Sequence, residues 1–190
     1  IKLSEKAYEL SKKFSINQKL SEAIIRESDV VFGGVSGFVI TSSNNIMAPN
    51  AGIDKSNSQG KLILYPNDPY QVAEQIKRKF FLDYNLHVGI IIVDSRLMPA
   101  RIGTSGVAIA CSGIEPVLDR RATKDLDGNV LKVTFQAIAD NLASIANHKM
   151  GEADELIPLA IIRESGAKLT DRRISSEETA IPYDECVYVR

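Results

Sequence analysis

The stretch VGIIIVDS, from Val88 to Ser95, decides which fold the sequence predicts. Its first six residues, Val88 to Val93, form a continuous apolar run that is bounded by polar residues. Such a run is typical of a strand that is buried on both faces, because none of its side chains is suited to face water. Asp94 follows directly, so we expect this carboxylate at the carboxyl end of the strand. Ligand sites favour that position.

Helices and strands alternate on both sides of this run. Amphipathic helices are expected at 4–14 and 16–27, a long helix at 131–149, and another that begins at Asp68-Pro69 and ends near Asp83. Short β-rich segments are expected at 30–32, 37–41, 46–48, 62–65, 107–111, 158–162 and 187–189. The pattern predicts an α+β protein with mixed sheets and flanking helices, organised as a single domain over residues 1–190.

Composition narrows the classes of function. The chain has 23 basic and 24 acidic residues, so its charge gives no general reason to bind nucleic acid or an anionic membrane. No apolar run approaches the roughly 20 residues of a membrane-spanning helix, and we expect a cytoplasmic protein. Cys111 and Cys186 are far apart and have no metal-ligand spacing, which favours reduced, buried thiols over a disulfide or a zinc site.

Two acidic positions are followed by hydroxyl or amide groups. Asp54 lies in the loop NAGIDKSNSQG, residues 50–60, before Ser56 and Asn57, and Asp94 precedes Ser95. If the two carboxylates converge, they repel each other unless a cation neutralises them, so the pair would predict a site for Mg²⁺ or Mn²⁺. The alternative is structural, because Asn, Asp, Ser and Gly are also the usual residues of turns. Without further information the turn is the more common explanation.

Several segments in order carry a resemblance to one family. The phrases NAGIDKSN (50–57), LYPNDP (64–69) and IIVDS (91–95) are similar to those of the coenzyme F420-0:L-glutamate ligase family, also called F420-0:gamma-glutamyl ligases. Further similar segments follow in the same order, at 101–103, 107–110, 119–121, 125–128, 134–146, 151–154 and 157–158. The resemblance extends from about Ser28 to Arg163, and NAGxDxSN is its most specific phrase.

The resemblance implies a function. Enzymes of that family use GTP and a divalent cation to join L-glutamate by an amide bond to the deazaflavin coenzyme F420-0, and they form homodimers with an unusual α+β fold. By the same resemblance, Asp54, Asp94 and Ser95 would bind Mg²⁺ or Mn²⁺, with K⁺ as a further candidate ion. Asn57 would contact GTP, and Arg101 would orient anions during catalysis. A segment bordering the nucleotide would consist of Met150, Gly151, Glu152, Ala153, Asp154, Glu155, Leu156 and Ile157, with Glu152 as an additional metal neighbour.

The sequence also departs from the family pattern. Leu97 and Met98 occupy positions where the family usually has glycine and arginine, and no counterpart of the family's N-terminal segment is recognisable. Two alternatives therefore stay open beside the GTP-dependent ligase. One is a catalytically weak paralogue or fragment that binds nucleotide and metal, and the other is an amide ligase for a different carboxylate. The sequence leaves open the number of glutamates added and the choices of GTP over ATP and Mg²⁺ over Mn²⁺.

Overall fold

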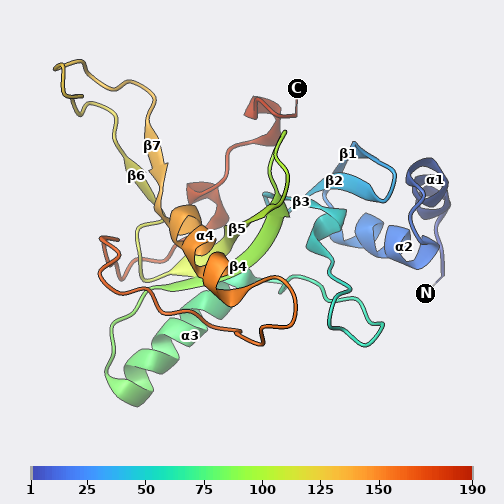
Figure 1. Cartoon of the computed structure of the whole chain (residues 1–190), viewed down its shortest axis with the longest axis horizontal. Helices are drawn as coiled ribbons and strands as arrows, with labels where there is room; N and C mark the ends of the chain where they lie inside the picture. Colours follow the sequence, from blue (N-terminus) through green and yellow to red (C-terminus); the bar gives the residue numbers. More distant parts are fainter. Residues whose placement is uncertain (1, 190) are drawn as a thin grey trace. The chain divides into compact units, whose positions relative to one another are not determined.

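The chain is organised as two compact units in a computed structural model that describes residues 2–189. Unit 1 comprises Ile1–Asn67 and Ala180–Arg190, and unit 2 comprises Asp68–Thr179. Figure 1 shows unit 1 in blue to cyan with the red end of the chain, and unit 2 in green to orange-red. The predicted single domain over residues 1–190 stays a prediction, and its first and last residues lie outside the described part.

Unit 1 combines two helices with a three-stranded sheet. Its elements are α1 (Glu5–Phe14), α2 (Gln18–Glu27), β1 (Val30–Val35), β2 (Phe38–Ser43) and β3 (Ile46–Pro49). The sheet is antiparallel with the order β1-β2-β3. Ser4 caps α1 by accepting from the amide of Ala7, and Asn17 caps α2 by accepting from the amide of Lys19. The helices predicted at 4–14 and 16–27 and the strands predicted at 30–32, 37–41 and 46–48 are confirmed.

The core of unit 1 lies between the two helices, strand β2 and the segment after β3. It contains Leu10, Phe14, Ile16, Leu20, Ala23, Ile24, Val39, Ala51 and Ile53. A buried carboxylate also joins the helices. Glu22 of α2 is only 4% exposed, and its Oε2 accepts from Ser4 N at 2.8 Å and from Ser4 Oγ at 2.7 Å. Its other oxygen accepts from Arg26 Nε at 2.8 Å, so both oxygens of this buried charge are hydrogen-bonded.

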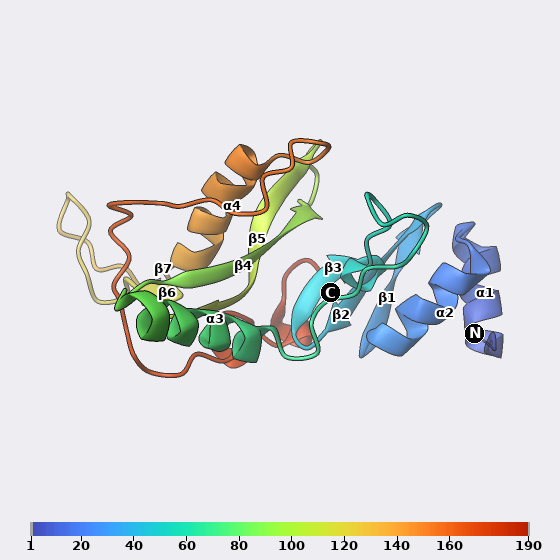
Figure 2. The ribbon, with the colours of Figure 1, turned by 90° about the horizontal axis from the view of Figure 1, so that it is seen from below.

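Unit 2 is built on a two-stranded antiparallel ladder with one helix on each face. Its elements are α3 (Pro69–Tyr84), β4 (Ile90–Leu97), β5 (Thr104–Ser112), β6 (Val117–Asp119), β7 (Phe135–Ala137) and α4 (Ile138–Met150). Figure 2 shows α4 on one side of β4 and β5 and α3 on the other. Strands β6 and β7 form a hairpin that projects from this unit (Figure 1). Asp68 accepts from the amide of Gln71 at the start of α3, as its sequence predicts.

The central strand differs from the prediction at both ends. Strand β4 starts at Ile90 and continues to Leu97, so Asp94 lies within the strand rather than at its carboxyl end. Asp94 pairs with Val107 and Ser95 with Gly106, because β5 is long enough to continue the ladder past the apolar run. Residues 90–96 are half-buried and not buried on both faces as predicted. Helices α3 and α4 pack on the two faces of this ladder, and they leave the side chains of β4 partly exposed.

Four other segments also differ from the prediction. The expected strand at 62–65 makes only an isolated bridge, between Asp54 and Ile63. Segments 158–162 and 187–189 are not strands, because none of residues 2–189 pairs with them in a ladder. The helix expected at 131–149 begins only at Ile138, because 135–137 pair with β6. The α+β class is confirmed, and the ladders between the named strands are antiparallel.

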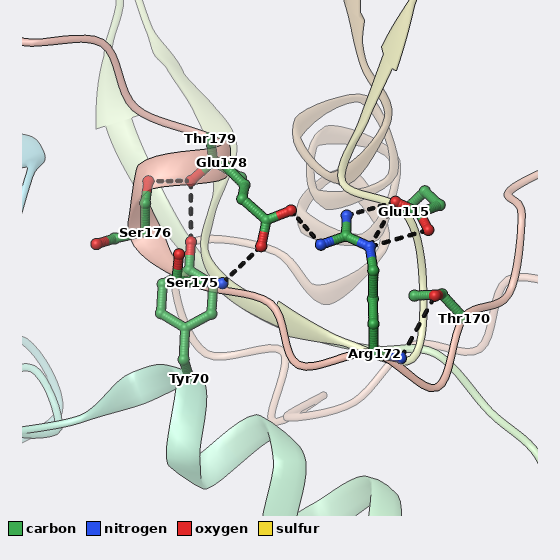
Figure 3. Close-up of polar contacts among 8 residues, drawn as sticks. All are labelled: Tyr70, Glu115, Thr170, Arg172, Ser175, Ser176, Glu178 and Thr179. Atoms are coloured by element: carbon green, nitrogen blue, oxygen red, sulfur yellow. Dashed lines mark hydrogen bonds and ion pairs between the residues drawn. The ribbon is translucent and has the colours of Figure 1, made fainter.

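Residues 167–179, which are irregular apart from a bridge at Leu169 and the 3-10 helix Ser176–Glu178, complete the second core, and we call this segment the strap. The core consists of Cys111, Ile114, Ala139 and the strap residue Ile174. Two backbone hydrogen bonds attach the strap to the segment after β5. The amide of Thr170 donates to Gly113 O at 3.0 Å, and Lys168 O accepts from the amide of Glu115 at 2.9 Å. Figure 3 shows the polar groups that fix it: Arg172 lies between Glu115 and Glu178, and Tyr70 of α3 contacts Thr179.

Among the described residues, no helix combines the length and the apolar character that crossing a membrane requires.

Candidate functional site

An unusual backbone turn presents the first predicted metal ligand in unit 1. Asn50, Ala51 and Gly52 have consecutive positive φ angles of 52°, 59° and 66°. The Asn50 side chain accepts from the amide of Val39 at 3.0 Å, which holds the turn against β2. Immediately after the turn, Ile53 enters the core and Asp54 is exposed. Two adjacent residues thus have opposite roles: Ile53 anchors the loop in the core, and Asp54 presents its carboxylate to solvent.

Asp54 closes its own turn. Its Oδ1 accepts from Lys55 N at 2.6 Å, Ser56 N at 2.8 Å and Ser56 Oγ at 2.5 Å. Burial raises the pKa of Asp54, but these hydrogen bonds outweigh it and hold the pKa below the ordinary value. The carboxylate is therefore ionised at neutral pH. The turn interpretation is correct for Oδ1, while Oδ2 takes no part in these three bonds.

The rest of this loop is tied together by its hydroxyl groups. Asp54 and Ile63 exchange backbone hydrogen bonds of 3.1 and 2.9 Å, which brings the two ends of the loop together. Ser58 Oγ lies 2.7 Å from both Lys55 O and Lys61 O. Asn57, the predicted GTP contact, is exposed in this loop and has φ 49°. The loop thus holds an ionised carboxylate and an exposed amide three residues apart.

In unit 2 the structure brings together two predicted site residues that are distant in sequence. Ser95 Oγ of β4 donates to Glu152 Oε2 at 3.0 Å, although the residues are 57 positions apart. Glu152 Oε1 accepts from Asn147 Nδ2 of α4 at 2.7 Å. The hydroxyl and the carboxylate are hard oxygen donors, which Mg²⁺ and Mn²⁺ prefer. Successive residues of a strand face opposite sides, so Asp94 is expected on the face of β4 away from Ser95.

The segment predicted to border the nucleotide follows α4 directly. Met150 ends the helix, and Gly151 leaves it with φ 84°. Glu155 folds back so that its Oε2 accepts from the amide of Ala153 at 2.8 Å, and backbone hydrogen bonds, first that from Ala153, lower the pKa of Glu155. The remaining residues of the segment, Asp154, Leu156 and Ile157, are exposed.

Arg101, the predicted catalytic arginine, lies in the connection between β4 and β5. Its amide donates to Met98 O at 3.2 Å, and the residue is exposed. Asp54 belongs to unit 1, whereas Asp94 and Arg101 belong to unit 2. The convergence of Asp54 and Asp94 on one metal, with Arg101 nearby to orient anions, stays a prediction for that reason.

The donor chemistry fits a divalent cation whose coordination is completed by other ligands. Within residues 2–189, no three His, Cys, Asp or Glu residues group closely enough to hold a metal by themselves. Mg²⁺ usually takes only one or two carboxylates and completes its shell with water and phosphate. A carboxylate beside a hydroxyl, as at Glu152 and Ser95, matches that arrangement.

Asn147 is the residue of this cluster that the sequence analysis missed. A signal for it exists in the spacing, because Ala139, Ala143 and Asn147 follow one another at intervals of four. Ala139 and Ala143 are buried against the ladder. A polar residue at the next position of the same row is therefore expected to face the protein and not the solvent. The spacing indicates where Asn147 lies but not what it contacts.

Comparisons with known proteins agree with the resemblance seen in the sequence. The family model described as F420-0:Gamma-glutamyl ligase matches residues 1–164. Proteins named "Coenzyme F420:L-glutamate ligase" are similar over most of the chain. That of Methanocaldococcus jannaschii is 38% identical over 97% of this chain and 74% of its own length. That of Methanopyrus kandleri is 37% identical over 81% of this chain and 62% of its own length, and the values for Methanosarcina mazei are 36%, 84% and 63%.

Proposed function

The chain belongs to the F420-0:Gamma-glutamyl ligase family, a family of ligases, and from this premise we propose that it joins L-glutamate to coenzyme F420-0 in a reaction driven by GTP. The observation that carries the proposal furthest is the contact of Ser95 with Glu152. It places a hydroxyl and a carboxylate together in unit 2, and both belong to the site that the family resemblance implies.

The proposed reaction has two steps. A terminal carboxylate of F420-0 attacks the γ-phosphorus of GTP, so that a new O–P bond forms, GDP leaves, and an acyl phosphate results. The amine of L-glutamate then attacks the acyl carbon, loses a proton and expels inorganic phosphate. An amide forms in this way. The first step is needed because a free carboxylate is a poor electrophile.

The chain's own residues have mainly binding and orienting roles in this proposal. Asp54, Asp94, Ser95 and Glu152 supply oxygen ligands, and Asn57 with residues 150–157 contacts the nucleotide. Arg101 is exposed beside β4 and orients anionic groups of the substrates. A bound Mg²⁺ or Mn²⁺ supplies neutralisation of the phosphate charge. We extend the proposal to a cytoplasmic homodimer, with K⁺ as a further candidate ion.

A second candidate is a module that binds nucleotide and metal without ligating glutamate. It is favoured by Leu97 and Met98, both partly exposed where β4 ends, because neither can bind an anion as an arginine would. The chain also spans less than two thirds of some relatives it matches, such as the 62% for Methanopyrus kandleri. An amide ligase for another carboxylate is the remaining alternative, since no residue here identifies the deazaflavin.

Calorimetric titration of GTP with and without Mn²⁺ tests the proposal at its first step. Wild type is expected to bind GTP in a metal-dependent manner, and Asp54→Asn and Asp94→Asn are expected to lose that dependence. Asp83→Asn, at the end of α3 in a surface ion pair with Lys79, is the matched control and should bind as wild type does.

A second experiment incubates the protein with F420-0, L-glutamate and GTP and monitors product formation by mass spectrometry. An added glutamyl residue supports the ligase. Metal-dependent GTP binding without any product would favour the binding module. Product formed with an alternative carboxylate and not with F420-0 would favour the third candidate.

A further inference from the structure

The Glu152 carboxylate is held from two sides. Asn147 Nδ2 donates to Oε1 at 2.7 Å and Ser95 Oγ donates to Oε2 at 3.0 Å. Glu152 itself is exposed and follows Gly151, whose φ of 84° takes the chain out of α4. A glutamate in such a position has several accessible rotamers, so its orientation depends on these two bonds.

Asn147 can orient Glu152 because its own position is fixed by backbone packing. Helix α4 lies directly on β5 at Gly106, where a Cβ would be 2.4 Å from Ala143 O and 2.6 Å from Asn147 Cβ. Ser144 Oγ also donates to Gly106 O at 2.9 Å. The contact leaves no room for α4 to shift towards the strand. The amide of Asn147 therefore extends from a rigid base next to the end of the helix.

The hydrogen-bond count leaves Glu152 able to take a further ligand. A carboxylate has about four lone-pair sites, and Asn147 and Ser95 each use one. The remaining sites are available to a cation beside the hydroxyl oxygen of Ser95. Asn147 donates only its N–H and carries no charge, so it orients the carboxylate without neutralising it.

We propose that Asn147 is a positioning residue, which holds the Glu152 carboxylate beside Ser95 in the orientation that binds a divalent cation. This inference rests on the proposed function, because that function supplies the need for a cation at Ser95 and Glu152. Groups that orient metal ligands in this way typically change metal affinity by about 10- to 100-fold when they are removed.

The test is the affinity for Mn²⁺ alone, measured by electron paramagnetic resonance on the whole chain without nucleotide. Asn147→Ala and the nearly isosteric Asn147→Leu both remove the donor, and each is expected to weaken Mn²⁺ binding by about 10- to 100-fold. Asn147→Gln keeps an amide on a longer arm and should recover part of the loss. Asn141→Ala, an exposed amide on the same helix, is the control and should bind as wild type does.

A readout of catalysis separates positioning from general damage to the fold. With an active ligase, Asn147→Leu should raise the half-saturating Mn²⁺ concentration while kcat at saturating Mn²⁺ stays near that of wild type. Thermal unfolding of each variant shows whether it folds. If either Asn147→Ala or Asn147→Leu fails to fold, the other variant carries the test.

The inference and the proposed function fail in different ways. The inference is overturned if Asn147→Ala and Asn147→Leu both fold and bind Mn²⁺ as tightly as wild type does. It is also overturned if the wild-type protein binds no Mn²⁺. If Mn²⁺ binding depends on Asn147 but no glutamate is ligated, the inference stands as a metal site and the proposed ligase activity fails.

Discussion

Arg172 forms a bidentate ion pair with Glu115: Nε donates to the two carboxylate oxygens at 3.1 and 3.2 Å, and Nη2 bonds the second oxygen as well (Figure 3). Nη1 of the same guanidinium bonds Glu178 at the far end of the strap. The strap lies beyond residue 164, where the match to the family model ends. One side chain thus connects this segment to the turn after β5 by the planar geometry that only arginine offers.

Arg172→Lys should loosen the strap even though it keeps the charge. A lysine cannot form the two-pronged contact, so we expect faster hydrogen exchange at the amides of Thr170 and Glu115, which attach the strap to the core. Arg121→Lys breaks a similar bidentate pair with Asp119 in the β6–β7 hairpin and should leave those two amides unchanged. Equal exchange in wild type and Arg172→Lys would show that the backbone bonds alone hold the strap.

Glu22 should make unit 1 sensitive to acid. Hydrogen bonds from Ser4 N and Oγ, with that from Arg26, lower the pKa of Glu22 from 4.5 to about 2. A pKa that is depressed in the folded state stabilises the protein above the unfolded value and loses this effect as pH falls through the folded value. Glu22→Gln should therefore be less stable than wild type at pH 7, and the difference should shrink as pH falls from about 4.5 towards 2. Urea unfolding at several pH values measures it.

The control for this pH dependence is Glu9→Gln, because Glu9 is exposed on α1. We expect the Glu9→Gln variant to be about as stable as wild type at each of these pH values. A difference between wild type and Glu22→Gln that is constant from pH 7 to pH 2 would contradict the role given to the Glu22 charge.

Gly106→Ala should destabilise unit 2. The added Cβ would approach Ala143 O to 2.4 Å, and a backbone atom cannot swing aside as a flexible side chain does. We expect a loss of about 1–3 kcal/mol in the free energy of unfolding, together with faster exchange of amides in the last turn of α4. Gly128→Ala is the comparison, since a Cβ there meets nothing within 4 Å. Its φ of 85° carries a conformational cost, but exchange in α4 should be unaffected.

Cys111 should resist alkylation while the protein is folded. Burial, with smaller contributions from Glu178 and Asp140, raises the pKa of its thiol from 9.0 to about 12. At a given pH this lowers the thiolate fraction by about a thousandfold, and the thiolate is the nucleophile. Cys186, which is partly exposed, should be the residue that iodoacetamide labels, as read by mass spectrometry. Rapid labelling of a folded Cys186→Ser variant would show that Cys111 is accessible.

Local signals in the sequence were sufficient for α1, α2 and α3 and for strands β1 to β5, but they missed the start of α4 and both strands of the β6–β7 hairpin. Asp68-Pro69 marks the start of α3 because a capping oxygen followed by a proline favours a helix start whatever the rest of the chain does. The same kind of reasoning failed for 158–162, where apolar β-branched residues are present but no partner strand accompanies them. A strand depends on its neighbour, and the neighbour is not a local property.

The same division holds for the candidate site. The oxygen-bearing side chains of Asp54, Ser95 and Glu152 can be read from the sequence, and their role as metal ligands, which rests on the family resemblance, stays a prediction. The partners of Glu152 could not be predicted, because it meets Ser95 across 57 residues and meets Asn147 only after the chain has turned at Gly151. The prediction that Asp94 ends its strand was wrong for a related reason, since the length of β5 decides where β4 stops.

The division of the chain into units also has a consequence for its synthesis on the ribosome. Unit 2 is one continuous run, Asp68–Thr179, whereas unit 1 combines Ile1–Asn67 with Ala180–Arg190. The rings of Phe32 and Tyr183 pack edge to face with their centroids 5.6 Å apart, which joins the two segments of unit 1. Helices α1 and α2 are translated before unit 2, whereas residues 180–190 of the same unit are translated after it. Unit 1 thus begins to be synthesised before unit 2 and can be completed only after it.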